Sequence, residues 1–236
     1  MSMKWLAACG FAALALLGSV CAQAAGYPTE HQLRQALNDI DGLVRAEGLT
    51  LEVRDARQEG VALPLYSAGL NLGSNTCVVF FNTLMEDGLT QFFAAVSERD
   101  LPLLLRAISV HEVTHCIEQR EAYVRRQFNK VLPHAYQQHD MTLQGYFTLI
   151  KSGAVETWGE ALADITSVLY LKQTVPEQWL PLARRISAMR RDLAQKWPQH
   201  DTSPWLDPLI GANPDLADDA NLFAAAFRYR RQLWPG

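Results

Sequence analysis

Apolar residues in the middle of the chain are spaced as on the buried face of a helix. Between Leu104 and Ile117 they recur every three or four positions, a repeat typical of an amphipathic helix. Asp100 is a residue type that caps helix N-termini, and Pro102 suits a first helical turn. We therefore predict a long helix from Asp100 to about Arg125. Leu162, Ile165, Val168 and Leu169 follow the same spacing and predict a second helix packed in the core.

The remaining pattern predicts more helices around a small sheet. Helices are expected over residues 29–46, opened by a capping box of Thr29 and Gln32, from residue 87 or 90 to 97, and over 142–151, 176–196 and 214–233. Strands are expected over residues 49–53, 61–66 and 76–82, with loops over 69–75 and 197–213. The predicted fold class is α+β, predominantly α-helical.

The first 24 residues have the pattern of a secretory signal peptide. Lys4 precedes an apolar run from Leu6 to Val20, and Ala22-Gln23-Ala24 resembles a cleavage site. We expect a mature chain of residues 25–236 that forms a single domain and is exported, either periplasmic or secreted. The apolar run is short for a membrane span, so no stable span is expected after signal removal, although an uncleaved anchor stays open. Cys21 lies in a poor match to a lipoprotein motif.

Charge excludes one class of partner. Without Lys4, 20 basic residues oppose 25 acidic ones, which gives a mature net charge of −5 with neutral histidines. A nucleic-acid-binding domain is normally basic, so no nucleic-acid partner is expected. The oligomeric state is left open.

The segment His111-Glu112-Val113-Thr114-His115 carries the candidate chemistry. Side chains four residues apart lie on one face of a helix, so both imidazoles can bind one Zn²⁺ ion. Glu112 then lies beside the open coordination position, where a general base is needed. We predict His111 and His115 as metal ligands and Glu112 as the catalytic base.

A third ligand is expected from the second helix. Glu160 and Asp164 lie one turn apart on the same face. We predict Glu160 as the third ligand and Asp164 as the acceptor of the outer N–H of a ligating histidine, most simply His111. Glu156 continues the same stripe and is the alternative third ligand.

The two motifs together resemble the gluzincin branch of zinc metallopeptidases, in which HExxH and ExxxD lie on adjacent helices. The resemblance covers about residues 76–170, and the strand before the motif resembles the compact minigluzincin core. It implies a zincin-like fold, one zinc ion per chain and a peptide or protein substrate. The connection from His115 to Glu160 is longer than in compact members, and this insertion is expected to cover or shape the cleft. Glu118 and Glu121 occupy positions where the metzincin pattern needs Gly and His.

Cys77 and Cys116 remain after signal removal. Export allows a disulfide between the strand and the catalytic helix, and two buried thiols are the alternative.

The predicted activity is hydrolysis of peptide bonds by a zinc-activated water. We expect residues 76–81 to offer a strand edge to an extended substrate. Several polar side chains are candidates for an oxyanion donor, and the sequence does not rank them: His134, Tyr136, His139, Tyr146, His200, Arg228 and Tyr229. Two other functions stay open. The first alternative is a catalytically inactive, zinc-stabilised binding or scaffold protein of the cell envelope. The second is an exported helical interaction protein in which the motif arose by chance.

Overall fold

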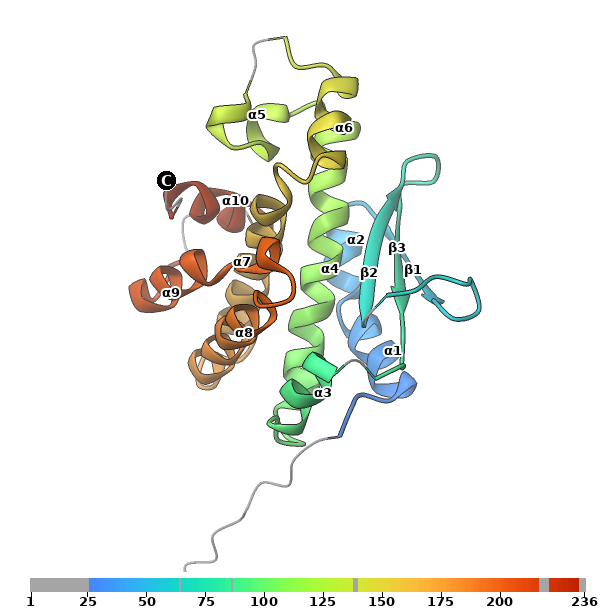
Figure 1. Cartoon of the computed structure of the whole chain (residues 1–236), viewed down its shortest axis with the longest axis vertical. Helices are drawn as coiled ribbons and strands as arrows, with labels where there is room; N and C mark the ends of the chain where they lie inside the picture. The colour runs from blue at the N-terminus through green and yellow to red at the C-terminus, as the bar shows by residue number, and fades with distance from the viewer. Residues whose placement is uncertain (1–25, 64, 86, 138–139, 217–220, 234–236) are drawn as a thin grey trace, which may run out of the picture.

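A single long helix, α4 (Leu101–Tyr123), stands at the centre of the fold. The computed structural model describes residues 26–63, 65–85, 87–137, 140–216 and 221–233, so the predicted signal peptide lies outside the described residues. Figure 1 shows a small sheet on one side of α4 and α7 (Glu156–Thr174), α8 (Trp179–Leu193), α9 (Ser203–Ala212) and α10 (Leu222–Gln232) on the other. The fold is therefore α+β and predominantly helical, as predicted. Among the described helices, none combines the length and the apolar character that crossing a bilayer requires.

The sheet has three strands in the order β1-β3-β2. They are β1 (Thr50–Asp55), β2 (Tyr66–Asn71) and β3 (Thr76–Phe81), with β1 parallel and β2 antiparallel to β3. Cys77, Val79 and Phe81 alternate along β3 and are fully buried. Alternate residues of a strand share one face, so this face of the sheet packs into the core.

The prediction for the second strand is wrong. Residues 61–63 are not in a strand, and β2 begins at Tyr66, where the predicted strand ended. Gly69 was taken to mark a loop, but it pairs with Val78 inside the ladder. An edge strand tolerates glycine and small residues because only one of its edges is paired.

The N-terminal helix is also divided. The capping box is confirmed, with the Thr29 side chain accepting a bond from Gln32 N, but α1 (Glu30–Asp39) ends near Ile40 and α2 (Asp41–Ala46) follows. Asn, Asp and Gly are weak helix formers, and residues of these types surround the break. Gly48, with φ of 75°, follows α2.

The insertion between the two predicted metal motifs lies beside one end of α4 (Figure 1). It contains α5 (Phe128–Val131), the 3₁₀ turn η1 (His134–Tyr136) and the predicted helix α6 (Leu143–Lys151). The Tyr146 ring of α6 lies 5.5 Å from the rings of both Tyr123 and Phe128. The insertion is therefore anchored to α4 through an aromatic cluster.

The C-terminal part differs from the prediction in two helix starts and in one additional helix. Helix α8 begins at Trp179 instead of residue 176, helix α9 lies within the predicted loop 197–213, and α10 begins at Leu222 instead of residue 214.

Two helices in the middle of the chain also differ in detail from the prediction. Asp100 takes the N-cap position of α4 without a side-chain capping bond. The short helix α3 (Asp87–Ala94) ends before residue 97.

Candidate metal centre

The two histidines of the HExxH motif project together from the middle of α4. Their ring centroids lie 4.9 Å apart, and the two Nε2 atoms approach to 3.2 Å. His111 is buried and His115 is partly exposed. One turn of helix therefore presents two imidazole nitrogens to the same point, as the spacing predicts.

Helix α7 packs beside α4 and brings Glu160 to the same point. Glu160 Oε2 lies 3.4 Å from His111 Nε2, and Glu160 Oε1 lies 3.5 Å from His115 Nε2. Ligand atoms of the three residues all lie within 4.8 Å of one another. We call these three residues, His111, His115 and Glu160, the ligand triad.

The spacing of the ligand triad fits a tetrahedral metal ion. Ligands about 2.0–2.2 Å from zinc lie roughly 3.3–3.6 Å from one another. The Nε2–Nε2 separation of 3.2 Å is close to such an edge, and the two histidine nitrogens lie 3.4 and 3.5 Å from different oxygens of the Glu160 carboxylate. In addition, Glu160 Oε2 is buried, and its contacts with nearby nitrogens lack hydrogen-bond geometry. Two imidazoles and one carboxylate are a donor set that zinc commonly uses.

Asp164 holds the outer nitrogen of His111. Its Oδ1 lies 2.8 Å from His111 Nδ1, one turn of α7 beyond Glu160. A carboxylate at this position favours the imidazole tautomer with its proton on Nδ1. The lone pair of Nε2 is then available to bind a metal ion between the three residues of the ligand triad. Burial raises the pKa of Asp164, but the charges of Arg190 and then His111 outweigh this effect and lower it to about 2.

Two further partners of Asp164 come from segments that the motif analysis did not single out. Arg190 on α8 places Nε 2.7 Å from Asp164 Oδ2 and Nη2 2.8 Å from Oδ1. Thr202, just before α9, donates its hydroxyl to Asp164 Oδ2 at 2.5 Å. Arg190 follows Leu182 and Ile186 at four-residue spacing on the buried face of α8, a signal that separates it from the other arginines of this helix but does not identify its partner. A lone threonine carries no sequence signal. These contacts depend on tertiary packing.

Glu112 is half-buried next to the ligand triad. Burial raises the pKa of Glu112 to about 7, while the charge of His111 opposes the shift and that of Glu160 adds to it. General bases work best with a pKa near the working pH. The environment of Glu112 thus suits proton transfer in neutral solution.

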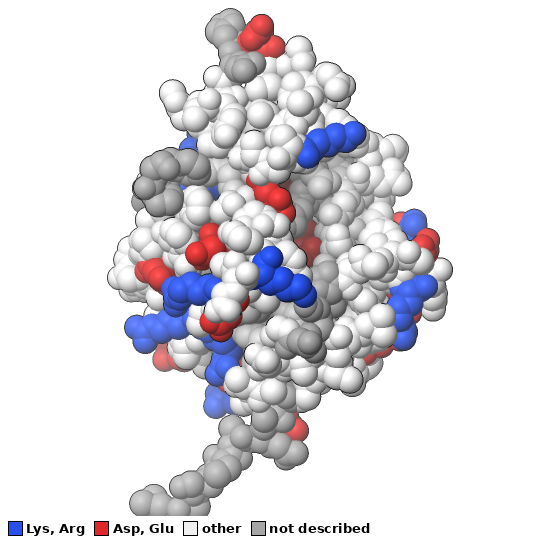
Figure 2. Space-filling model, viewed as in Figure 1, with Lys and Arg blue, Asp and Glu red and all other residues white. Residues whose placement is uncertain are grey.

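The ligand triad and Glu112 line a cavity of about 520 Å³. Figure 2 shows a hollow between the helices and the sheet, with acidic atoms inside it near the middle of this face. The charged lining residues are those of the metal centre, and the rest of the wall is mainly apolar: Ala62, Leu63, Leu65, Leu89, Ile108, Ile186, Met189, Leu193 and Trp197. A cavity with convergent polar groups on apolar walls is the usual form of a ligand site.

The strand edge beside the cavity belongs to β2, and the expectation for residues 76–81 is wrong. Strand β3 is paired on both sides, whereas Tyr66, Ser67 and Ala68 of β2 line the cavity. Leu65 O accepts a bond from Asn82 N, so residues 65, 67, 69 and 71 face β3 in the antiparallel ladder. The backbone groups of Tyr66 and Ala68 therefore point away from β3.

Glu156, the alternative third ligand, lies apart from the ligand triad. Its Oε1 is 3.5 Å from His200 Nε2, and His200 Nδ1 is 3.3 Å from Glu160 Oε2. Of the candidate oxyanion donors within the described residues, only His200 lines the cavity. His139 lies outside the described residues.

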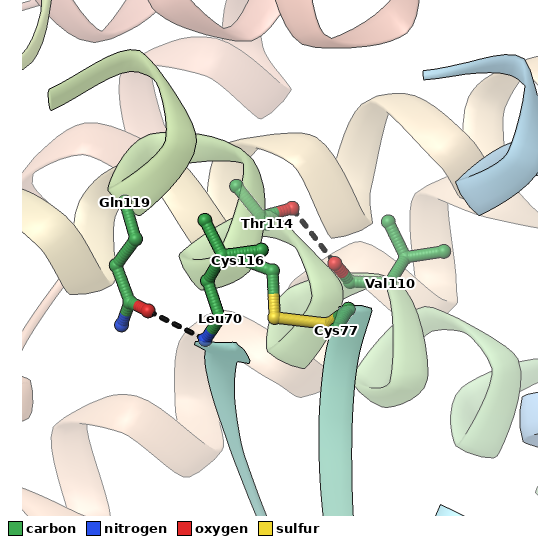
Figure 3. The surroundings of a disulfide bond; sticks show 6 residues. All are labelled: Leu70, Cys77, Val110, Thr114, Cys116 and Gln119. Carbon is green, nitrogen blue, oxygen red and sulfur yellow. Dashed lines mark hydrogen bonds between the residues drawn. A yellow bond between two sulfur atoms is a disulfide. The ribbon is translucent and has the colours of Figure 1, made fainter. Parts of the chain in front are cut away.

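The structure joins Cys77 and Cys116 in a disulfide with a Cα–Cα distance of 5.6 Å, so Cys116 is not free to bind metal (Figure 3). It ties β3 to α4 one residue beyond His115. On the same turns of α4, Gln119 Oε1 accepts a bond from Leu70 N of β2 at 2.8 Å. The disulfide and this side-chain hydrogen bond thus both attach the sheet to α4.

Comparisons with models of protein families, with curated proteins and with solved structures found no match to this chain.

Proposed function

We propose that the chain is an exported zinc-dependent peptidase of the gluzincin type. The observation that carries the proposal is the ligand triad, in which two adjacent helices bring ligand atoms of three residues within 4.8 Å of one another, with Glu112 beside them and a cavity in front. Zinc bound there would supply a Lewis acid that lowers the pKa of a water molecule and polarises the substrate carbonyl. Glu112 takes the proton of the attacking water and passes it to the leaving amine.

A peptide substrate is favoured by the free edge of β2. The outward backbone groups of Tyr66 and Ala68 border the cavity that contains the ligand triad. An extended peptide pairs with such an edge through its main chain, which does not require a particular sequence. The apolar walls favour a large apolar side chain near the bond that is cut.

Two features support the proposal over an inactive zinc-stabilised scaffold. Structural zinc sites normally have four protein ligands, whereas the candidate group contains three. A structural site also has no need of a carboxylate base beside the metal. Export is supported by the signal-like first 24 residues and by the Cys77–Cys116 disulfide, because disulfides persist in oxidising compartments.

The test is the zinc content of residues 25–236, measured by elemental mass spectrometry. We expect one zinc per chain in the wild type, loss of zinc in Glu160→Gln and retention in Glu156→Gln. The two glutamates lie one turn apart on α7, so Glu156→Gln is a matched control. A peptide-library screen with Glu112→Gln as the inactive control then tests hydrolysis. A wild type without zinc after metal resupply would reject the proposal.

A further inference from the structure

Arg190 brings a permanent positive charge into the candidate metal centre. Its side chain is only 10% exposed, and it lines the same cavity as the ligand triad. A cation is unexpected beside a site that is proposed to bind a second cation, because like charges repel strongly where water is excluded.

The guanidinium reaches the carboxylates of Glu160 and Asp164. Besides the paired contacts with Asp164, Nη2 lies 3.4 Å from Glu160 Oε2. One rigid, planar group therefore connects the third ligand with the residue that orients His111. Arginine is suited to this task because its donors form a fixed fork.

The same nitrogen lies close to His111 without taking its metal-binding lone pair. Nη2 is 3.1 Å from Nδ1 and 3.3 Å from Nε2 of the imidazole. Such similar distances place Nη2 beside the ring, because a contact along the lone-pair axis of one nitrogen would leave the other much farther away. The ligand atom stays accessible while the charge remains close.

We propose that Arg190 pairs with Glu160 and Asp164 before metal is bound and lowers the affinity of the ligand triad for zinc. The inference rests on the proposed zinc site. Two physical effects act in the same direction. The guanidinium repels the incoming ion, and it shares the charge of Asp164, which weakens the polarisation of His111.

Without bound metal, Arg190 is a permanent cation that pairs with these two buried carboxylates. Its removal would leave Asp164 with the neutral partner Thr202 and with His111. Buried carboxylates that lose a cation destabilise the fold. Arg190 therefore stabilises the metal-free protein and at the same time lowers its affinity for zinc.

The experiment compares wild type, Arg190→Gln and Arg190→Lys, each as residues 25–236. Zinc affinity is measured by competition with a chromophoric chelator, and the melting temperature is measured after EDTA treatment and again with zinc. We expect Arg190→Gln to bind zinc at least about tenfold tighter and to melt several degrees lower without metal. Arg190→Lys keeps the charge on a shorter side chain, so its affinity should lie between the other two.

Arg191→Gln is the matched control. Arg191 is the next residue of α8, but it is exposed and pairs with Asp207 at 2.6 Å, away from the centre. Its zinc affinity should equal that of the wild type. Equal or weaker binding in Arg190→Gln would overturn the inference, provided that the wild type binds zinc.

Three other outcomes remain decisive. A wild type that binds no zinc contradicts the proposed function itself. An Arg190→Gln protein that folds only with zinc supports the inference, because the ion then replaces the missing charge. If this variant does not fold at all, Arg190→Lys decides: about threefold tighter binding supports the inference, and unchanged or weaker binding overturns it.

Discussion

Two buried charged clusters lie next to one another along α4, and they are built differently. The first is the candidate metal centre, made of the ligand triad with Asp164 and Arg190. The second, which we call the closed ion pair, consists of Glu118 on α4 and Arg230 on α10. Glu118 follows His115 by three residues, so the two clusters are neighbours along the helix.

The closed ion pair does not line the cavity, and its arginine is enclosed on every side. Arg230 is fully buried, and its Nη1 donates to Glu118 Oε1 at 2.6 Å and to Trp158 O at 2.9 Å. The rings of Trp158 and Phe227 lie 4.3 and 5.2 Å from its guanidinium carbon. Burial lowers the pKa of Arg230, and the charge of Glu118 opposes this shift.

The metal centre is open by contrast. Its side chains line the cavity, and the buried Glu160 Oε2 has no contact of hydrogen-bond geometry. Burial of opposite charges is therefore common to both clusters and does not identify function. The candidate metal centre is distinguished by convergent donor atoms that face a cavity. In the closed ion pair, the two charged groups bind each other instead.

The sharpest test of this difference compares two glutamates of α4. Glu112→Gln should lower kcat/KM for peptide hydrolysis by about 10²–10⁴-fold, because the general base is lost, while zinc content and melting temperature stay near wild type. Glu118→Gln should have the opposite profile, with reduced stability and near-normal activity of the folded protein. Equal loss of activity in both variants would contradict the division into two clusters. The measurements are kinetics with a peptide from the library screen, metal analysis and thermal melting.

The closed ion pair should show its effect in stability. Arg230→Met leaves Glu118 buried without its cation, which we expect to lower the free energy of unfolding by about 3–5 kcal/mol. Adding Glu118→Leu should recover part of the loss, because an apolar pair of similar volume avoids desolvation of both charges. Urea unfolding of the single and double variants measures both effects. A double variant less stable than Arg230→Met would show that the pair stabilises beyond mutual compensation.

Sequence reasoning brings together the residues whose relative positions a helix determines. His111 and His115 are linked by four-residue spacing on α4, and Glu160 and Asp164 by the same spacing on α7. The local geometry of one helix turn makes such pairs predictable. The adjacency of the two helices came from the gluzincin resemblance, since spacing within one helix says nothing about its neighbour.

The partners that complete the metal centre could not be found in this way. Arg190 and Thr202 reach Asp164 from a different helix and from a connection, so their contacts depend on how α8 and α9 pack against α7. The edge strand β2 was misassigned for a related reason. Its residues Ser67, Ala68 and Gly69 have weak local preference for a strand, and pairing with β3 determines their conformation.

Removing the disulfide between β3 and α4 should change stability less than the variants of the closed ion pair. Cys77→Ala with Cys116→Ala should lower the free energy of unfolding by about 2–4 kcal/mol, because the bond closes a long loop in the unfolded chain. Since Gln119 still holds Leu70, we expect zinc content to remain at one per chain. Guanidinium unfolding and metal analysis test this prediction, with wild type under reducing conditions as the comparison. Loss of zinc in the double variant would mean that the disulfide positions the ligand triad as well as stabilising the fold.

The smallest predicted effect concerns the free edge of β2. Ala68→Pro removes a backbone N–H that points away from β3, so the ladder is kept while one hydrogen bond to an extended peptide is lost. One such bond contributes about 0.5–1.5 kcal/mol, and we expect kcat/KM for long peptides to fall about 3–10-fold. Ala68→Gly, which keeps the N–H, is the control and should stay closer to the wild type.

Peptides too short to reach β2 are a second control and should be cut equally by the wild type and both variants. An equal loss for short and long peptides would mean that proline has disturbed the metal centre, and no loss with either would show that substrates do not pair with β2. Either result would leave the open cavity beside the metal, and not the strand edge, as the feature that separates the metal centre from the closed ion pair.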